Sequence, residues 1–227
     1  MLDLIKRNRT FFIPYFLLLI AMLIIQLYYG NPKLTFWINS KHELVFDPLF
    51  KFFTSLGEGT IGLFLAAILI FIRFGKAVVA LVISNVAGLL AQLLKHTLFS
   101  KTMRPAVYFL HHHPGLHFVP GVPIFHDQSF PSGHSTTAFS IAALLSMFSK
   151  SKNASYFFLA LAICVGWSRM YLGEHFFTDV MGGATLGGIT SLICYYFVEK
   201  STLPQKRWYQ LNLQTILLKH KQIKKGN

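Results

Sequence analysis

Six apolar stretches recur along the chain and constrain its fold more strongly than any other feature. They lie at residues 11–29, 60–75, 77–97, 132–150, 154–172 and 177–198. Each is close to the length of about 20 helical residues that crosses the hydrocarbon core of a bilayer. In addition, 53% of the residues are hydrophobic and the mean hydropathy is +0.50, which is more than a soluble domain can cover with polar surface. The sequence therefore predicts an all-α bundle of six transmembrane helices.

The segments around these stretches predict one membrane-integral domain over residues 1–227. Residues 34–57 mix aromatic side chains with lysines and acids at partly helical spacing, which predicts a short helix in the membrane interface. No small-residue cleavage site follows the first stretch, so we expect it to remain as a span. Residues 199–227 predict a basic cytoplasmic tail. Cys164 and Cys194 stand alone inside apolar runs and are expected to be small packing residues.

Basic residues are distributed unequally between the two sides of the predicted bundle. The chain has 21 Lys and Arg and 8 acidic residues, which gives a formal charge of +13. One side receives 14 of the basic residues, namely Lys6, Arg7, Arg9, Arg73, Lys76, Lys150, Lys152 and seven from Lys200 onward. The positive-inside rule then predicts that both termini are cytoplasmic and that the 100–131 connection is on the outer, periplasmic side. Because the charges lie between apolar segments, we expect an anionic bilayer as partner and no nucleic acid.

Three segments carry ionisable groups at or near the ends of predicted spans. They read LLKHTLFSKTMRP, PSGHS and WSRMYLGEHFFTDVMGG. Ionisable groups at membrane depth are costly, so a span that carries them usually uses them. The six-span topology brings all three segments to the outer face, where their cations, two histidines and one aspartate predict a site for a highly charged oxyanion.

His175 and Asp179 are four residues apart, a spacing that stacks two side chains on a helix. Asp179 is then able to accept the proton on Nδ1 of His175, which leaves Nε2 as a nucleophile. In an isolated motif of a soluble protein, a simple cap or ion pair would be the better interpretation. Beside Arg169 in a membrane sequence, we favour an oriented catalytic histidine.

The segment PSGHS is typical of a helix start that binds an anion. Ser132 follows Pro131 and is a suitable N-cap, while Gly133 leaves room for an anion at the exposed N–H groups of the first turn. His134 projects from that turn, where its protonated form is able to act as a general acid for a departing oxygen. A structural histidine is the alternative.

Arg104 and Arg169 offer planar forks that suit phosphoryl oxygens, and a lysine supplies a further point charge. Two lysines are candidates. On an unbroken helix Lys101 would share the face of Arg104 and Lys95 would not, but Pro105 is expected to end the helix nearby, so the helical angle leaves both open.

These residues make the chain resemble the type 2 phosphatidic acid phosphatase superfamily, which also includes vanadium-dependent haloperoxidases and bacterial acid phosphatases. The family signature has three parts, K-x6-R-P, P-S-G-H and S-R-x5-H-x3-D. The last two parts are complete and in order, as Pro131, Ser132, Gly133 and His134, and as Ser168, Arg169, His175 and Asp179.

The first part of the signature departs from the family pattern. Arg104 and Pro105 are present, but Thr97 stands at the expected lysine position, and Lys95 lies at K-x8-R-P. We assign the family's lysine to Lys95 because it closes an apolar run as that lysine does. Lys101 stays as the alternative.

The resemblance implies a membrane-integral bacterial lipid phosphatase of the inner membrane. In the mechanism that the resemblance implies, His175 forms a phosphohistidine, Asp179 orients His175, and His134 protonates the leaving group. The phosphate oxygens would be held by Lys95, Arg104, Arg169, Ser132 and the Gly133 amide. No metal and no cofactor are implied. Candidate substrates are undecaprenyl pyrophosphate, phosphatidylglycerol phosphate, phosphatidic acid and the phosphates of lipid A. No oligomeric state is predicted.

Two other functions compete with a lipid phosphatase. A vanadate-binding haloperoxidase would share the anion site, but those proteins are soluble and lack six spans. A transporter or channel for an anionic lipid or phosphate would also gather Arg and His between spans, yet it would not require the His175 and Asp179 pair with His134 opposite.

The 100–131 connection is rich in histidine. A metal site is conceivable there, but Asp127 is the only carboxylate of this connection, so we favour a wet interfacial cluster that contacts lipid phosphate. The histidines concerned are His111, His112, His113, His117 and His126.

Overall fold

The computed structural model describes residues 1–112, 115–149 and 151–215, and these residues form helices and no strands. This confirms the predicted all-α fold. The helices are α1 Leu2–Arg7, α2 Arg9–Tyr29, α3 Asn31–Ser40, α4 Asp47–Ser55, α5 Thr60–Ile72, α6 Phe74–Thr97, α7 Pro105–His112, α8 Gly133–Phe148, α9 Lys152–Tyr171, α10 Phe177–Lys200, the 3-10 turn η1 Leu203–Gln205 and α11 Arg207–Gln210.

Helices occupy all six positions predicted for spans, but they differ in length. Four of them, α2, α6, α9 and α10, are long and apolar enough to cross a membrane, and α4 with α5 forms a fifth candidate that is bent by 65°. Helix α8 has 16 residues, of which 12 are buried. It is about 24 Å long, shorter than a hydrocarbon core of roughly 30 Å. The structure therefore supports four or five spans in its described part, and six remains a prediction.

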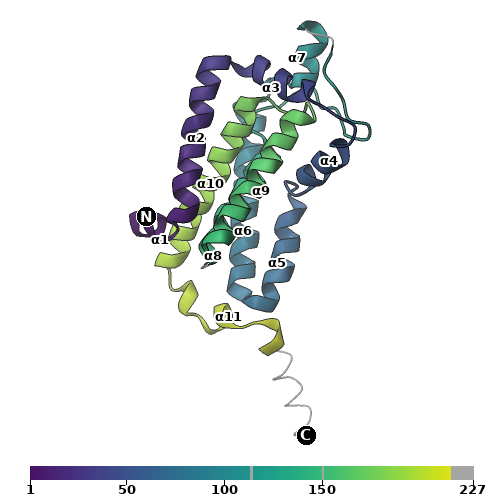
Figure 1. Cartoon of the computed structure of the whole chain (residues 1–227). Coiled ribbons are helices and arrows are strands. Elements are labelled where there is room, and N and C mark those ends of the chain that lie inside the picture. The colour runs from purple at the N-terminus through teal and green to yellow at the C-terminus, as the bar shows by residue number, and fades with distance from the viewer. Residues whose placement is uncertain (113–114, 150, 216–227) are drawn as a thin grey trace.

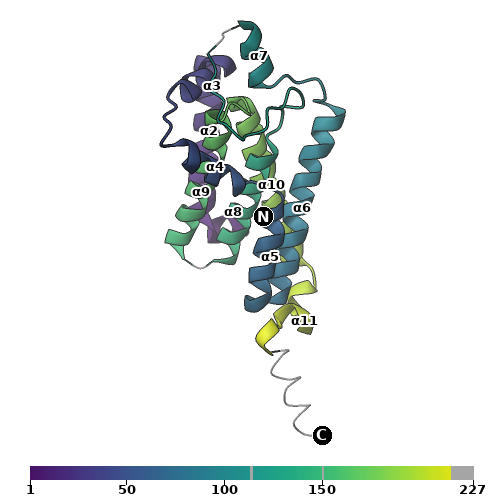
Figure 2. The ribbon, with the colours of Figure 1, turned by 90° about the vertical axis from the view of Figure 1, so that its right-hand side faces the viewer.

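The bundle has two distinct ends (Figure 1, Figure 2). Helices α1 and α11 and the turn between α5 and α6 lie at one end, whereas α3 and α7 lie at the other. The end with α1 and α11 carries basic residues that the positive-inside rule assigns to the cytoplasm, among them Arg7 and Arg73. Which end faces the cytoplasm stays a prediction.

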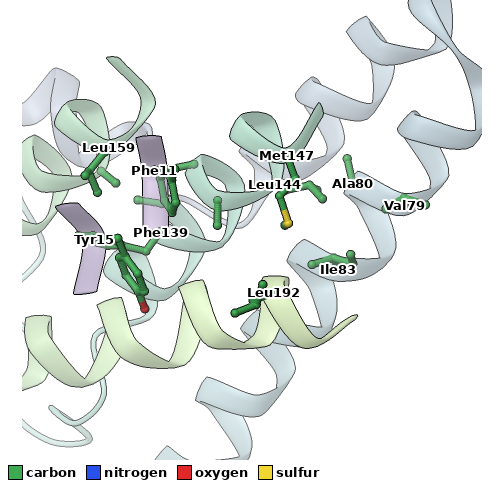
Figure 3. Close-up of a cluster of buried hydrophobic side chains, with 14 of the residues drawn as sticks. Phe11, Tyr15, Val79, Ala80, Ile83, Phe139, Leu144, Met147, Leu159 and Leu192 are labelled. Carbon is green, nitrogen blue, oxygen red and sulfur yellow. The ribbon is translucent and has the colours of Figure 1, made fainter. Parts of the chain in front are cut away.

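The core is built where α2, α6, α8, α9 and α10 meet (Figure 3). Phe11 and Tyr15 of α2 are fully buried, and Tyr15 packs against Phe139 of α8 with ring centroids 6.1 Å apart. The Tyr15 hydroxyl donates a hydrogen bond to the Ala184 carbonyl of α10 over 2.9 Å. A buried tyrosine needs such a partner, and this one fixes α2 against α10. Cys194 is unpaired and packs at the margin of the core, as predicted for a packing residue.

Helices α8 and α10 approach each other closely through glycine. A Cβ on Gly187 would lie 2.1 Å from the carbonyl oxygen of Thr136, and one on Gly183 would lie 2.4 Å from that of Ser132. Two small residues four apart are typical of tightly packed membrane helices. The contact sets the distance between the start of α8 and the start of α10, where the Ser132 amide donates to the Asp179 carbonyl over 2.9 Å.

We expect Gly187→Ala to destabilise the bundle by about 1–3 kcal/mol, because the new methyl group meets backbone that cannot move aside alone. The check is the thermal unfolding midpoint in detergent. Gly88→Ala on α6 is the matched control, since a Cβ there would meet nothing within 4 Å and alanine favours a helix. An equal midpoint for Gly187→Ala and the native protein would show that α8 and α10 can move apart to accommodate the methyl group without loss of stability.

Two segments differ from the sequence prediction at the end that carries α3 and α7. Residues 34–57 contain the end of α3 and all of α4, with a turn between them. The 100–131 connection contains α7, and Pro105 begins that helix instead of ending the previous one. Proline favours the first position of a helix because its missing N–H would be unpaired there anyway.

The segment after α10 also differs from a simple tail. It folds back onto α6, where Tyr209 of α11 is buried against Gly75. The Phe74 amide donates to the Leu211 carbonyl over 2.7 Å. This part of the predicted tail is therefore packed structure, and residues 216–227 lie outside the described residues.

Candidate active site

The predicted site residues gather at the end of the bundle that carries α3 and α7. They come from the last turns of α6 and α9, and from the residues just before and at the start of α7, α8 and α10. Ser132 and the ionisable members Lys95, Arg104, Arg169, His175 and Asp179 are buried, whereas Gly133 and His134 are half-buried. We call Lys95, Arg104 and Arg169 the cation cluster.

His175 and Asp179 face each other, but not as two residues of one helix. Helix α10 begins at Phe177, so His175 lies just before it, and Nδ1 of His175 is 3.4 Å from Oδ2 of Asp179. The same Oδ2 accepts the Phe176 amide over 2.8 Å and the hydroxyl of Ser129. Asp179 therefore caps the helix start and contacts the imidazole at once, because its side chain folds back toward the N-terminus.

The start of α8 has the N-cap that the sequence predicted. Ser132 is the N-cap residue, and its hydroxyl accepts bonds from the Ser135 amide and hydroxyl at 3.4 and 3.1 Å. A Cβ on Gly133 would meet nothing within 4 Å, so the backbone at this helix start is open. The half-buried His134 follows, packed against the turn between α4 and α5 at Gly57.

The two arginines of the cation cluster converge beside the histidine. Nη1 of Arg104 lies 3.3 Å from Nε2 of His175. Arg104 is fixed by its Nε bond to the Asp127 carbonyl over 3.0 Å, and Arg169 donates from Nη1 to the hydroxyl of Thr54. Nε of Arg169 is buried and has no hydrogen-bond partner in the described part of the chain.

The two candidate lysines differ in position. Lys95 is 6% exposed, and its Nζ donates to the Gln128 carbonyl over 3.0 Å. Lys101 is exposed in the turn after α6. Helix α6 ends at Thr97, so the angular relation of Lys101 to Arg104 on a continuous helix does not apply. Lys95 is therefore buried, as Arg104 and Arg169 are, whereas Lys101 is exposed.

The surroundings of His175 favour its neutral form. Burial lowers the pKa of His175 well below its ordinary value, and the positive charges of Arg104, Arg169 and Lys95 lower it further. A neutral imidazole whose Nδ1 contacts a carboxylate presents a lone pair on Nε2. This is the form that a nucleophile requires.

Comparison with known proteins identifies the family of the chain. Residues 73–203, more than half of the chain, match the model of the PAP2 superfamily. The chain belongs to this superfamily. The match covers every candidate site residue named above, from Lys95 to Asp179.

Among individual PAP2 relatives, phosphatidylglycerophosphatase B of Bacillus subtilis is 39% identical over 34% of this chain and 44% of its own length. Undecaprenyl-diphosphatase BcrC of Bacillus subtilis is 28% identical over 70% of this chain and 79% of its own. The crystal structure of LpxE from Aquifex aeolicus superposes with a TM-score of 0.65 at 28% identity, covering 73% of this chain and 94% of that one. The two curated relatives are named as phosphatases, and the chain spans less than half of the first.

The geometry also identifies residues that the PAP2 signature does not contain. Glu174 pairs with both arginines, with Oε2 at 3.0 Å from Nη1 of Arg104 and 3.1 Å from Nη2 of Arg169. Ser129 contacts Asp179, and Thr54 contacts Arg169. Glu174 was visible in the sequence beside His175, but Thr54 is far from the motifs and only the packing of α4 on α9 brings it there.

The histidines of the 100–131 connection do not gather at one point in the part described. His117 pairs with Asp47 over 3.4 Å and stacks on His42 with ring centroids 3.8 Å apart. The side chain of His126 is exposed. Among the described residues no group of three potential ligands could hold a metal ion. His113 and the side chains of His111 and His112 lie outside the described residues.

Proposed function

We propose that this protein is a metal-independent lipid phosphatase that works through a phosphohistidine at His175. The observation that carries the proposal is the position of Nε2 of the buried His175, 3.3 Å from the guanidinium of Arg104, which Glu174 joins to the guanidinium of Arg169. Such forks suit the equatorial oxygens of a phosphoryl group. The buried Nε of Arg169, which has no partner in the described residues, is a further donor available for a phosphate oxygen.

In the first step the lone pair on Nε2 of His175 attacks phosphorus, and the bond from phosphorus to the lipid oxygen breaks. His134 gives its proton to that oxygen, while the charge of Asp179 stabilises the imidazole as it becomes a phosphohistidine. In the second step His134 takes a proton from water, whose oxygen attacks phosphorus and breaks the P–N bond. Phosphate leaves, and the protonated His134 and the neutral His175 are restored.

A groove supports a lipid as the substrate. It has a volume of about 630 Å³ and runs between α5, α6 and α8 to Gly133 and His134. Its walls combine apolar residues such as Leu63 and Leu89 with polar ones such as Gln92. An amphiphile with its phosphate at headgroup depth fits such a path. We propose that the groove opens to the bilayer near the periplasmic face of the bacterial inner membrane.

The proposal is tested by phosphate release from four lipids in detergent micelles with EDTA present. The lipids are undecaprenyl pyrophosphate, phosphatidylglycerol phosphate, phosphatidic acid and lipid A. We expect at least one to be hydrolysed by the native protein in EDTA. Turnover of none of them would favour binding or transport of an anionic lipid, and turnover that EDTA abolishes and zinc restores would refute the metal-free mechanism.

Lys95→Ala is expected to lower kcat/KM by about 10–100-fold, because it removes a buried cation from the proposed phosphate site. Lys101→Ala, which removes an exposed lysine, is expected to stay within about twofold of the native protein. Steady-state kinetics on the lipid that the native protein hydrolyses checks both values. The reverse order of the two effects would assign the phosphate-binding role to Lys101.

The pH dependence follows from the lowered pKa of His175. The imidazole is neutral and nucleophilic above its pKa, so the acid limb of kcat/KM due to His175 should lie below the ordinary value of about 6.5. Arg104→Gln removes a charge that lowers this pKa, so it should move the limb to higher pH. Ionisation of the substrate contributes equally to the pH profiles of the native protein and of Arg104→Gln. Lys101→Ala, which removes a positive charge at an exposed position, is the control for the loss of charge. An unmoved limb in Arg104→Gln would contradict the assignment.

A further inference from the structure

Glu174 places a carboxylate inside the cation cluster. Its side chain is 5% exposed, and Oε2 accepts hydrogen bonds from Nη1 of Arg104 over 3.0 Å and from Nη2 of Arg169 over 3.1 Å. One carboxylate oxygen therefore joins both guanidiniums. The three-part signature does not include this residue, and the mechanism above does not use it.

A substrate phosphate would need the N–H groups that Glu174 occupies. Nη1 of Arg104 is the atom that contacts both Glu174 and Nε2 of His175. A phosphorus atom placed for attack by Nε2 has its oxygens in this same space. Phosphate and the Glu174 carboxylate are thus competitors for one set of donors, and each phosphate that binds must displace the carboxylate.

The outcome of this competition depends on charge. A phosphate monoester, or the terminal phosphate of a diphosphate, carries about −1.5 to −2 at neutral pH. A phosphodiester carries a single negative charge, as the carboxylate does. Between two desolvated guanidiniums, binding of the dianion yields more electrostatic free energy than displacement of the carboxylate costs. A phosphodiester has no such electrostatic advantage over the carboxylate. It would also have to displace a Glu174 side chain that the protein chain already holds beside the arginines.

We propose that Glu174 determines specificity as an internal competing anion, which admits dianionic phosphate ends and excludes phosphodiester headgroups. This matters in a bilayer because most of its phospholipids are phosphodiesters, and they reach the groove at high local concentration. The inference rests on the proposed function, since it concerns the same site. Glu174 competes for the N–H groups of the arginines and takes no part in bond making or breaking, so it is a specificity residue and not a catalytic one.

The test compares native protein with Glu174→Gln in mixed micelles of phosphatidic acid, or of another dianionic lipid that the native protein hydrolyses, with rising amounts of phosphatidylglycerol. Diacylglycerol at the same mole fraction corrects for surface dilution. We expect native KM to change by less than twofold beyond dilution and the variant's apparent KM to rise about tenfold. Without phosphatidylglycerol, the inhibition constant of orthovanadate should fall about tenfold in the variant.

Glu43→Gln is the matched control, because Glu43 is an exposed acid at the same end of the bundle. It should respond to phosphatidylglycerol as the native protein does. If Glu174→Gln does not fold, Glu174→Asp replaces it, since a shorter carboxylate bridges the arginines less well and should show the same changes at smaller size.

Two outcomes would overturn the inference. One is an equal response to phosphatidylglycerol in native protein and variants. The other is a Glu174→Gln variant whose apparent KM is raised but which orthovanadate inhibits no more strongly than it inhibits the native protein. That result would mean that Glu174 merely holds the arginines. Both leave native turnover intact, whereas absence of turnover in the native protein would refute the proposed function itself.

Discussion

His175→Ala is expected to lower the rate of lipid phosphate hydrolysis by at least about 10⁴-fold, because it removes the atom that bonds to phosphorus. The fold should persist, since the polar contacts that the imidazole makes with described residues are those with Arg104 and Asp179. Phosphate release over several hours, with the unfolding midpoint measured in parallel, tests this. Exposed His96, next to Lys95 in α6, supplies the control variant His96→Ala, which should retain native activity.

A covalent intermediate gives this prediction a second readout. Native protein quenched in alkali during turnover of a ³²P-labelled lipid should retain acid-labile label, and His175→Ala should retain none. A variant with more than a tenth of native activity, or label that survives on His134, would exclude His175 as the nucleophile.

Asp179→Asn is expected to lower kcat by about 10²–10⁴-fold, as losing the oriented carboxylate does in comparable triads. The amide oxygen is still able to accept the Phe176 and Ser129 bonds that the carboxylate accepts, so α10 should begin at the same residue. What is lost is the negative charge that stabilises the imidazole as phosphorus bonds to it. The measurement is kcat together with the unfolding midpoint.

Ser129→Ala separates charge from hydrogen bonding at Asp179. It removes one bond to Oδ2 and keeps the carboxylate, so its kcat should fall by less than about tenfold. If both variants lose activity equally, the position of Asp179 matters and its charge does not. If Asp179→Asn is as active as native protein, Asp179 serves the helix start alone.

Much of the fold and the site could be predicted from the sequence. Apolar stretches of helical length indicated where helices would form, because that pattern depends on neighbours within a few turns. The N-cap at Ser132 and the His175 and Asp179 contact lie within short segments, so their spacing alone was informative. The spacing was nevertheless misleading in detail, since His175 precedes α10 and the aspartate reaches back to it.

The sequence by itself determined an all-helical membrane fold and the residue types of the proposed anion site, because both follow from local patterns. Only the tertiary structure distinguished buried Lys95 from exposed Lys101, since helical phase is lost where α6 ends at Thr97. It alone joined Glu174 to Arg104, 70 residues away, and Thr54 to Arg169. Contacts between such distant segments depend on how helices pack, and the close α8–α10 approach at Gly187 sets that packing beside the site.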